Sequence, residues 1–150
     1  MLTHIPHGLA EIVATYGDAS APSFEQLCIV SFDLPYPLLY DGKPVHRSRC
    51  HKLLVENFQF AFERIKSAGL EAECKNYGGI FAKRAKRGSS KASTHSWGIA
   101  IDLEPYKYPL GSKARMPDAV VGIWKEAGFG YGGDFAKRLD PMHFQCAVSY

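Results

Sequence analysis

Two short segments of the chain concentrate residue types that can bind a metal ion and move protons. The first contains His95 and Asp102, and the second, about forty residues later, contains Asp140 and His143. Two imidazoles and one carboxylate are a common ligand set for catalytic zinc, which keeps its fourth position for water. A second carboxylate that stays off the metal can act as a general base. The chain thus offers His95, Asp102 and His143 as ligands, with Asp140 as the spare carboxylate.

Strand geometry explains how side chains from two segments can converge. A strand over Gly98–Leu103 places Asp102 on the face opposite the core, beside small residues that leave this face open, and His95 lies just before the strand. A strand over His143–Val148 begins with the second histidine. Pro141 holds the aspartate before it in an extended conformation, since a residue before proline avoids the α region. We therefore expect the four side chains to meet at one point.

The same residues also fit a purely structural interpretation. Two buried histidines can hydrogen-bond to two aspartates and so hold loops together. A ligand set divided between two segments is less specific than a single motif such as HExxH. Spacing alone leaves both the metal site and the structural network open.

The elements around these segments are predicted from apolar periodicity. Three amphipathic helices, each followed by a glycine, are expected over Leu9–Tyr16, Leu54–Ala68 and Val120–Ala127. His51, just before the second helix, is expected at the surface. Strands are expected over Leu27–Phe32, Leu70–Cys74, Gly98–Leu103 and His143–Val148.

The order of these elements indicates the fold class. Strands and helices do not alternate in a regular βαβ rhythm, and the proline-containing segment Glu104–Met116 is typical of a loop. We predict an α+β fold in which helices flank a small, mostly antiparallel sheet. The length of 150 residues is that of one domain with one core, so residues 1–150 are expected to form a single domain without a separate binding module.

Composition narrows the class of protein further. Hydrophobic residues make up 46% and charged residues 22% of the chain, which excludes a disordered or collagen-like protein. The sequence shows neither a signal peptide nor an apolar run long enough to span a bilayer. Four widely spaced cysteines without a CxxC pair favour a reducing compartment: Cys28, Cys50, Cys74 and Cys146. We expect a monomer made in a cytoplasm, without integral membrane association.

A resemblance to a known family covers roughly Tyr77–Gln145. The motif Ser-x-His-x-x-Gly-x-Ala-x-Asp over Ser93–Asp102, followed by Asp-x-x-His over Asp140–His143, resembles the zinc D-alanyl-D-alanine carboxypeptidase and dipeptidase superfamily, peptidase family M15. That family includes VanX- and VanY-like enzymes and the L-alanyl-D-glutamate peptidases of phage endolysins. Trp97 and the run Gly128–Phe135 are part of the match. The first half of the chain agrees only in general layout.

The resemblance implies a role for each site residue. His95, Asp102 and His143 would bind one Zn²⁺ ion, and Asp140 would be the general base. An arginine upstream of the first histidine contacts the substrate or the developing oxyanion; Arg84 is our first choice and Arg87 the second. Ser93 is expected in the pocket wall. Gln145 stands where many relatives carry glutamate, which affects only the tuning of the second histidine.

Charge adds information about the substrate. The chain has a formal net charge of +3, and a cluster of five basic residues precedes the first histidine: Lys83, Arg84, Lys86, Arg87 and Lys91. This basic segment can be a solvated loop, which is our interpretation of its three lysines. It can also recognise the carboxylates of peptidoglycan stem peptides. Nucleic-acid binding is not expected, because the chain has no helix-turn-helix or RNA-binding motif.

These inferences lead to one expected function and two alternatives. We expect an endolysin-type zinc metallopeptidase that cuts peptidoglycan stem peptides, at L-Ala–D-Glu or D-Glu–diaminopimelate, and so degrades the bacterial cell wall. It would be made in the host cytoplasm without a signal peptide and act on the wall or in the periplasm. The alternatives are a D-Ala-D-Ala dipeptidase or carboxypeptidase, and a zinc-binding module without catalytic activity.

Overall fold

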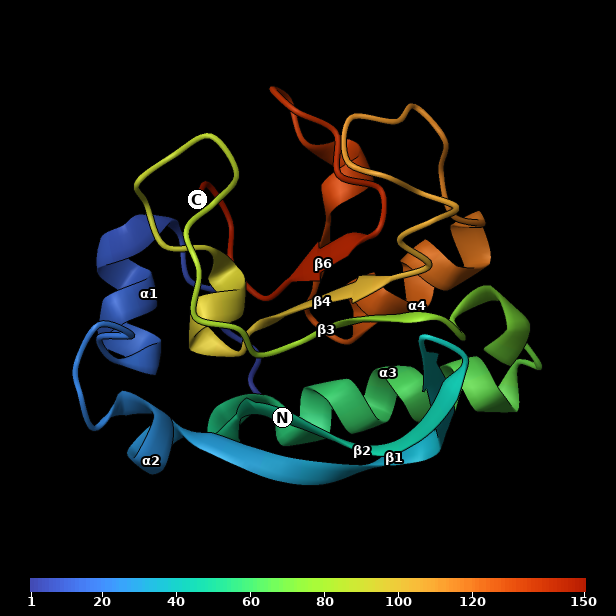
Figure 1. The fold of residues 1–150 in the computed structure, drawn as a ribbon, viewed down its shortest axis with the longest axis horizontal. Coiled ribbons are helices and arrows are strands. Elements are labelled where there is room, and N and C mark those ends of the chain that lie inside the picture. The colour runs from blue at the N-terminus through green and yellow to red at the C-terminus, as the bar shows by residue number, and fades with distance from the viewer.

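Four helices and two antiparallel sheets make up the fold, and the computed structural model describes residues 1–150 (Figure 1). The predicted α+β class with antiparallel pairing is confirmed, although the strands form two sheets and not the single sheet that we predicted. The helices are α1 (Gly8–Tyr16), α2 (Phe24–Cys28), α3 (Val55–Ser67) and α4 (Asp118–Glu126). The strands are β1 (Ile29–Tyr40), β2 (Lys43–His51), β3 (Tyr77–Gly79), β4 (Ala100–Leu103), β5 (Gly130–Tyr131) and β6 (His143–Gln145).

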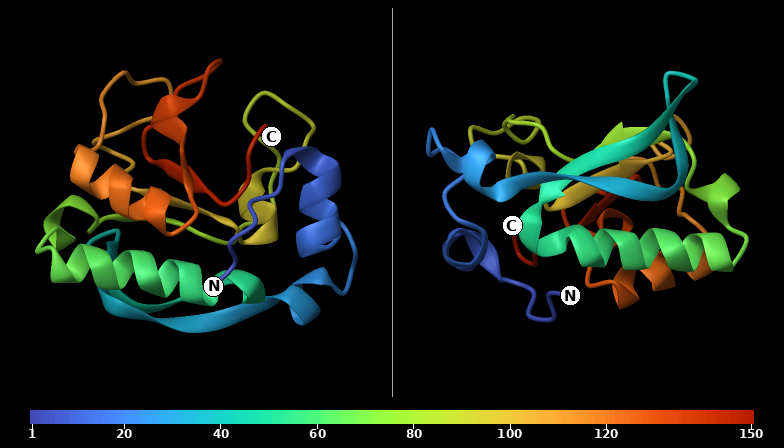
Figure 2. Two further views of the ribbon diagram at one scale, coloured as in Figure 1. Left: turned by 180° about the vertical axis from the view of Figure 1, so that it is seen from behind. Right: turned by 90° about the horizontal axis from the view of Figure 1, so that it is seen from below.

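The first sheet is a long hairpin of β1 and β2 that packs against α3. Aromatic side chains make this contact: Phe32 stacks on Phe58 with ring centroids 5.8 Å apart, and Tyr36 meets Phe62 edge to face at 5.6 Å. Both helix residues lie on the apolar stripe that predicted this helix, so the stripe is a core face. Figure 2 shows α3 running alongside the hairpin.

The second sheet has the strand order β3-β4-β6-β5, with every pair antiparallel. Trp124 of α4 joins this sheet to α3, because its ring stacks on Phe144 of β6 at 5.2 Å and meets Phe62 edge to face at 5.2 Å. Phe144 alternates along β6 with two residues of the opposite face. The core thus lies on one face of the sheet, and the other face is left for the site.

One predicted strand is absent from the structure, and others have different bounds. Leu70–Cys74 contains a short 3-10 helix at Glu71–Glu73, because its amides bond three residues back, from Glu73 to Leu70 and from Cys74 to Glu71, instead of to a neighbouring strand. The strand predicted over Leu27–Phe32 begins at Ile29, after α2, and continues to Tyr40. The strand predicted over 143–148 ends at Gln145.

The structure also contains a strand that the apolar pattern does not reveal. β2 reads Lys-Pro-Val-His-Arg-Ser-Arg-Cys-His, and most of its side chains face solvent. Its last residue, His51, was expected at the surface but is buried with 1% of its area exposed. The His51 ring donates a hydrogen bond to the carbonyl of Tyr16 and accepts one from the amide of Leu53.

The three predicted amphipathic helices are confirmed with end shifts of one or two residues. Glu104–Met116 forms a loop, as expected. None of the helices combines the length and apolar character that crossing a membrane requires.

Candidate metal centre

A short turn places His95 at the edge of the second sheet. The turn is a 3-10 helix over Thr94–Trp97, capped by the Ser93 hydroxyl, which accepts a hydrogen bond from the His95 amide at 3.3 Å. Gly98 ends the turn at φ 68°, in the left-handed region. A Cβ on Gly98 would lie 2.8 Å from the His51 amide nitrogen, so glycine is required there for two reasons. The chain then enters β4 with Asp102 on the exposed face.

Strand register brings the second segment to the first. Asp102 of β4 is paired directly with His143 of β6, and Ile101 is paired with Phe144. Directly opposed residues of an antiparallel pair project their side chains from the same face. As a result, Asp102 and His143 share the site face, while Ile101 and Phe144 point into the core.

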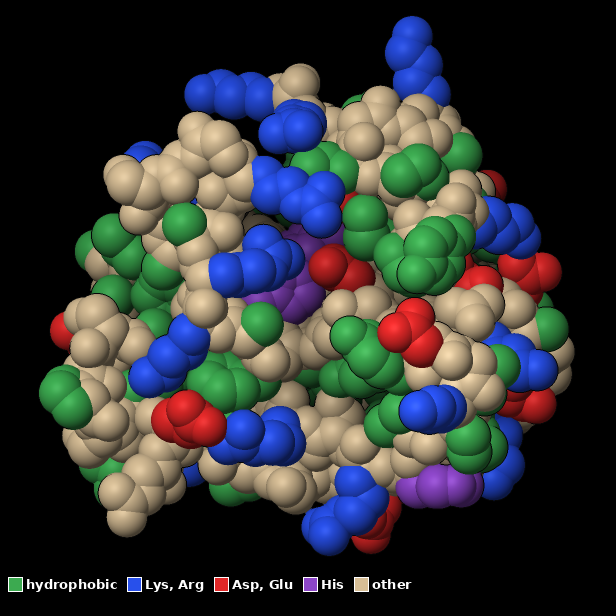
Figure 3. All heavy atoms as spheres, viewed as in Figure 1, with side chains coloured by type: hydrophobic (Ala, Val, Ile, Leu, Met, Phe, Trp, Pro, Cys, Tyr) green, Lys and Arg blue, Asp and Glu red, His purple; other side chains and the backbone are tan.

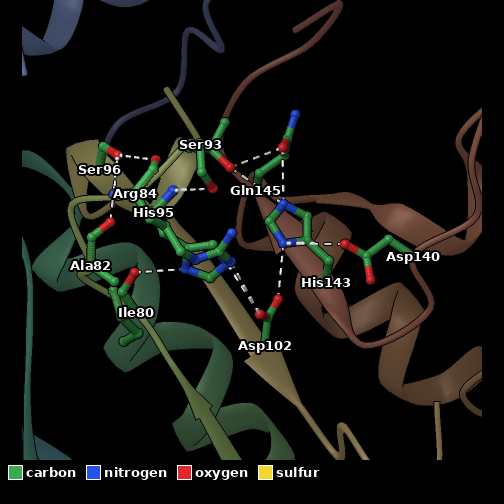
Figure 4. A network of polar contacts seen from close by, with 11 residues as sticks. Ile80, Ala82, Arg84, Ser93, His95, Ser96, Asp102, Asp140, His143 and Gln145 are labelled. Carbon is green, nitrogen blue, oxygen red and sulfur yellow. Dashed lines mark hydrogen bonds and ion pairs between the residues drawn. The ribbon is translucent and has the colours of Figure 1, made fainter. Parts of the chain in front are cut away.

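The three predicted ligands meet around the Asp102 carboxylate (Figure 4). Its Oδ1 lies 2.9 Å from Nδ1 of His143, and its Oδ2 lies 3.2 Å from Nε2 of His95. One ligand atom from each residue can be chosen so that all three lie within 4.8 Å of one another. Both histidines are buried. The structure therefore brings together His95, Asp102 and His143, as the sequence predicted.

The outer nitrogen of each imidazole is held by an oxygen that can only accept a hydrogen bond. Nδ1 of His95 donates to the carbonyl of Ile80 at 2.7 Å, and Nε2 of His143 donates to Oε1 of Gln145 at 2.9 Å. The amide of Gln145 is oriented by its own bond to the Ala147 carbonyl. Such outer partners fix the tautomer and ring orientation of a metal-binding histidine. The inner nitrogens, Nε2 of His95 and Nδ1 of His143, are thus the ones aimed at the carboxylate.

This arrangement calls for a positive charge at its centre. In those tautomers two nitrogen lone pairs face the Asp102 carboxylate, so either a bound cation or a second proton on the rings must lie between them. Burial raises the pKa of Asp102, but its contacts with His143 and His95 outweigh burial, and the pKa lies well below its ordinary value. Burial lowers the pKa of His143, but the hydrogen bond that a protonated Nδ1 can donate to Asp102 reverses the shift, so the pKa lies above its ordinary value. A divalent cation fits this donor set of two imidazoles and one carboxylate.

The side chain of Asp140 lies beside the ligand atoms without a hydrogen bond to them. Its Oδ2 is 4.0 Å from Nδ1 of His143, and its Oδ1 is buried without a partner. Burial raises the pKa of Asp140 above its ordinary value, although the charge of His143 acts in the opposite direction. The amide of His143 donates to the carbonyl of Asp140 at 3.0 Å, which closes a turn with Pro141 in its second position. This turn is the physical reason for the three-residue spacing.

The backbone of Gly132 packs closely against that of Asp140. The amide of Asp140 donates to the carbonyl of Gly132 at 2.9 Å. A Cβ on Gly132 would lie 2.2 Å from the carbonyl oxygen of Asp140, a separation that real Cβ atoms do not show. Gly132 belongs to the run Gly128–Phe135, whose role the sequence did not reveal. Close packing of its backbone against that of Asp140 explains why this position of the run is a glycine.

The basic segment Lys83–Lys91 forms one rim of the site. Nη2 of Arg84 lies 4.0 Å from Oδ2 of Asp102, and the hydroxyl of Ser96 bonds to both the amide and the carbonyl of Arg84. Arg84 and Arg87 both line a cleft of about 670 Å³ that reaches Asp102. Figure 3 shows a hollow with histidine side chains at its base and Lys and Arg side chains at its rim.

Two hydroxyl residues next to the first histidine, Ser93 and Thr94, support the ligand set. Ser93 is buried with its hydroxyl on the His95 amide, and its proposed contact with substrate stays a prediction. Thr94 donates to Oε1 of Gln145 at 3.1 Å and so supports the second histidine. Sequence reasoning missed Thr94 and the Ile80 carbonyl. A backbone acceptor leaves no trace in residue type, so only the fold could reveal the latter.

Comparison with known proteins agrees with this geometry. Residues 87–146 match the model of a peptidase M15 family described as D-alanyl-D-alanine carboxypeptidase. The matched stretch contains His95, Asp102, Asp140 and His143, whereas Arg84 lies outside it. No curated protein matches the chain. Peptidases of this family are metallohydrolases that typically carry zinc, which is consistent with the His-Asp-His set.

Proposed function

We propose that the protein is a zinc metallopeptidase that hydrolyses peptide bonds in peptidoglycan stem peptides. The observation that carries this proposal is the convergence of three buried or half-buried ligands beside a fourth, unbonded acid. A structural network does not need a second carboxylate, that of Asp140, whose Oδ1 is buried without a hydrogen-bond partner. The match of residues 87–146 to an M15 peptidase family supports the same reaction class.

The chain's own residues account for the proton transfers. When bound by His95, Asp102 and His143, zinc supplies Lewis-acid chemistry that polarises a carbonyl and acidifies water. Asp140 accepts a proton from the attacking water and delivers it to the nitrogen of the leaving amine. The peptide C–N bond breaks, and a carboxylate and an amine are formed. No covalent intermediate with the chain is needed.

Arg84 is assigned to the negative charge that develops on the carbonyl oxygen. Its Nη2 lies 4.0 Å from Oδ2 of Asp102, so this cation lies next to the ligand set. Arg87 lines the same cleft and offers a second cation for a substrate carboxylate. Because the substrate class is rich in carboxylates, two arginines at one cleft agree with a peptide stem that contains D-glutamate.

The bond that we propose is L-Ala–D-Glu or its neighbour D-Glu–diaminopimelate, as in endolysins that degrade the wall and cause lysis. A second candidate, removal of terminal D-alanine, is favoured by the description of the matched family. We further propose that the protein acts as a monomer on the wall or in the periplasm after synthesis in a host cytoplasm. A zinc-binding module without activity is the outcome if no bond is cut.

The decisive experiment is digestion of purified peptidoglycan by the zinc-loaded protein, followed by mass spectrometry of the fragments. Cleavage after L-alanine or after D-glutamate supports the endolysin-type activity, and release of free D-alanine supports the second candidate. The His95→Ala variant serves as the control for contaminating hydrolases. Intact muropeptides after digestion with a protein shown to contain one zinc ion would contradict the enzymatic proposal.

A further inference from the structure

The cleft continues beyond the metal ligands to an end lined by tyrosines. Near the ligands its lining includes Asp102, Arg84 and Arg87. Most of the rest comes from the tip of the β1–β2 hairpin, from residues 76–78 and from residues 105–110. Its aromatic members are Tyr40, Tyr77 and Tyr106. The volume of about 670 Å³ is within the range of pockets that hold small ligands, about 300–1,000 Å³. The ligand set uses only part of this space.

Tyr106 is exposed although the loop that carries it is held firmly. Its side chain is 88% exposed, whereas Tyr108 of the same loop is 4% exposed. The loop begins at Glu104, whose φ is 52° and whose buried carboxylate accepts hydrogen bonds from the amides of Lys75 and Asn76. The amides of residues 107 and 108 both donate to the Glu104 carbonyl. A fixed backbone thus presents the Tyr106 ring to solvent.

Tyr40 offers a second exposed ring from a different element. It lies at the tip of the β1–β2 hairpin and is 55% exposed. The turn that follows, Asp41-Gly42, has φ values of 48° and 74°, typical of a tight two-residue hairpin turn. The Tyr40 ring meets Tyr77 edge to face, with centroids 6.5 Å apart. The amide of Leu39 donates to the Lys75 carbonyl at 2.8 Å and ties the tip to the chain before β3.

The chemistry of this end differs from that of the arginine end. Two exposed rings provide flat apolar faces, and the carboxylate of Asp41 with the tyrosine hydroxyls provides hydrogen-bonding groups around them. A pyranose ring has the complementary pattern, with apolar C–H faces and a rim of hydroxyl and amide groups. A carboxylate-rich peptide is better accommodated at the other end, beside Arg84 and Arg87.

We propose that Tyr106 and Tyr40 form a saccharide subsite for the amino sugar to which the stem peptide is attached. This inference rests on the proposed function, since it names a further part of the same substrate. The subsite would allow the protein to distinguish a stem peptide still joined to its glycan from a released peptide. The preference would be expressed mainly in KM, because the sugar contacts no reacting atom.

The test compares one stem peptide with and without an N-acetylmuramoyl group at its N-terminus. We expect the wild-type protein to favour the glycopeptide in kcat/KM, and Tyr106→Ala to reduce that preference roughly three- to tenfold, through KM. Tyr106→Phe, which keeps the ring, should retain most of the preference. Leu53→Ala removes an exposed apolar side chain outside the cleft and should change nothing.

The possible results of this test distinguish the saccharide subsite from the proposed peptidase activity. If Tyr106→Ala weakens cleavage of both substrates equally, the ring binds the peptide and the saccharide proposal is wrong. If neither substrate is affected, the ring has no role in binding. Calorimetric titration of both compounds into the zinc-loaded Asp140→Asn variant, with and without Tyr106→Ala, repeats the comparison without turnover. Absence of cleavage by the wild type would remove the proposed function, while the binding comparison would still decide the subsite.

Discussion

Asp102 and Asp140 show how two carboxylates in one cluster acquire different properties. Contacts with His143 and His95 overcome the effect of burial on Asp102 and keep its pKa low, whereas burial raises the pKa of Asp140. Shifts in opposite directions are the usual mark of different roles within an acid–base site. Asp102 remains ionised as a ligand, and Asp140 is a better proton acceptor than an ordinary aspartate. These surroundings support the proposed roles of Asp102 as a ligand and Asp140 as the base.

Replacement of Asp140 by asparagine tests the base directly. Asparagine has nearly the same shape but cannot accept the proton, so kcat should fall by about 10²–10⁴. Asp140 does not bond to the ligand atoms, so one zinc ion per chain should still bind, as measured by atomic emission. A variant that binds zinc normally and digests cell wall at the wild-type rate would falsify the assignment.

Arg84 and Lys83 form a matched pair on the basic segment. Arg84→Ala removes the cation next to Asp102 and should lower kcat by about 10²–10³, as the loss of one oxyanion donor does elsewhere. Lys83 does not line the cleft, and Lys83→Ala should be without effect. Steady-state kinetics with a synthetic stem peptide measure both variants. Loss of zinc from the Arg84 variant would show instead that the arginine supports the metal site.

At the scale of elements, the backbone contact between Gly132 and Asp140 determines where the base lies. Gly132→Ala places a Cβ 2.2 Å from the Asp140 carbonyl oxygen, so the turn that carries the base must move. A displacement of about 1 Å can cost about 10²-fold in rate, and we expect such a loss in kcat with zinc affinity unchanged.

Gly130 of the same run provides the control for that substitution. A Cβ on Gly130 would meet its nearest backbone oxygen at 3.7 Å, an ordinary contact, and Gly130→Ala should retain activity. Circular dichroism checks that both variants are folded. If a folded Gly132→Ala protein retains wild-type kcat, the glycine does not position the base.

Element prediction succeeded where the residue pattern and the fold depend on the same periodicity. Alternation along β4 and β6 placed Asp102 and His143 on the site face, and the three-residue spacing from Asp140 proved to be a turn. β2 could not be predicted because its stability comes from pairing with β1 and not from an apolar face. The Gly132 contact and the Ile80 acceptor lie between backbones, where residue type carries little information.

At the scale of the whole molecule, the metal site joins the turn before β4 to β6 and should contribute to stability. A ligand present at a hundred times its Kd stabilises the folded state by about 2.7 kcal/mol. For a chain of this size that amounts to roughly 5–10 °C in Tm. We expect EDTA to lower Tm by this amount and to abolish activity, as followed by calorimetry. The His95→Ala variant should have the Tm of the EDTA-treated wild type, whether or not EDTA is present. Full activity of the wild type in excess chelator would contradict a metal centre.

Buried His51 should make stability depend on pH. Burial lowers its pKa below the ordinary value, so the unfolded chain takes up a proton at a higher pH than the folded one. The neutral His51 ring contributes fully to the free energy of unfolding above its pKa in the unfolded chain, about 6.5. This contribution is lost as the pH falls from there towards the lower pKa of His51 in the folded protein. A protonated ring also loses its bond from the Leu53 amide.

Urea unfolding at a series of pH values measures this contribution. Between about pH 6.5 and 5, the free energy of unfolding of the wild type should fall more steeply than that of His51→Gln, by at most about 1.4 kcal/mol per pH unit. His46→Gln, a change at an exposed position of β2, is the control. Identical slopes for the wild type and His51→Gln would show that His51 is not held neutral by the fold.

The order of strands in the second sheet has a consequence for synthesis on the ribosome. β6 lies between β4 and β5 but follows both in the chain, so the sheet remains open until residue 145 has left the exit tunnel. A nascent or prematurely terminated chain lacks both His143 and the strand that carries it. The ligand set is therefore assembled only after β6 has been synthesised, and products truncated before it would be fragments with two unpaired strand edges.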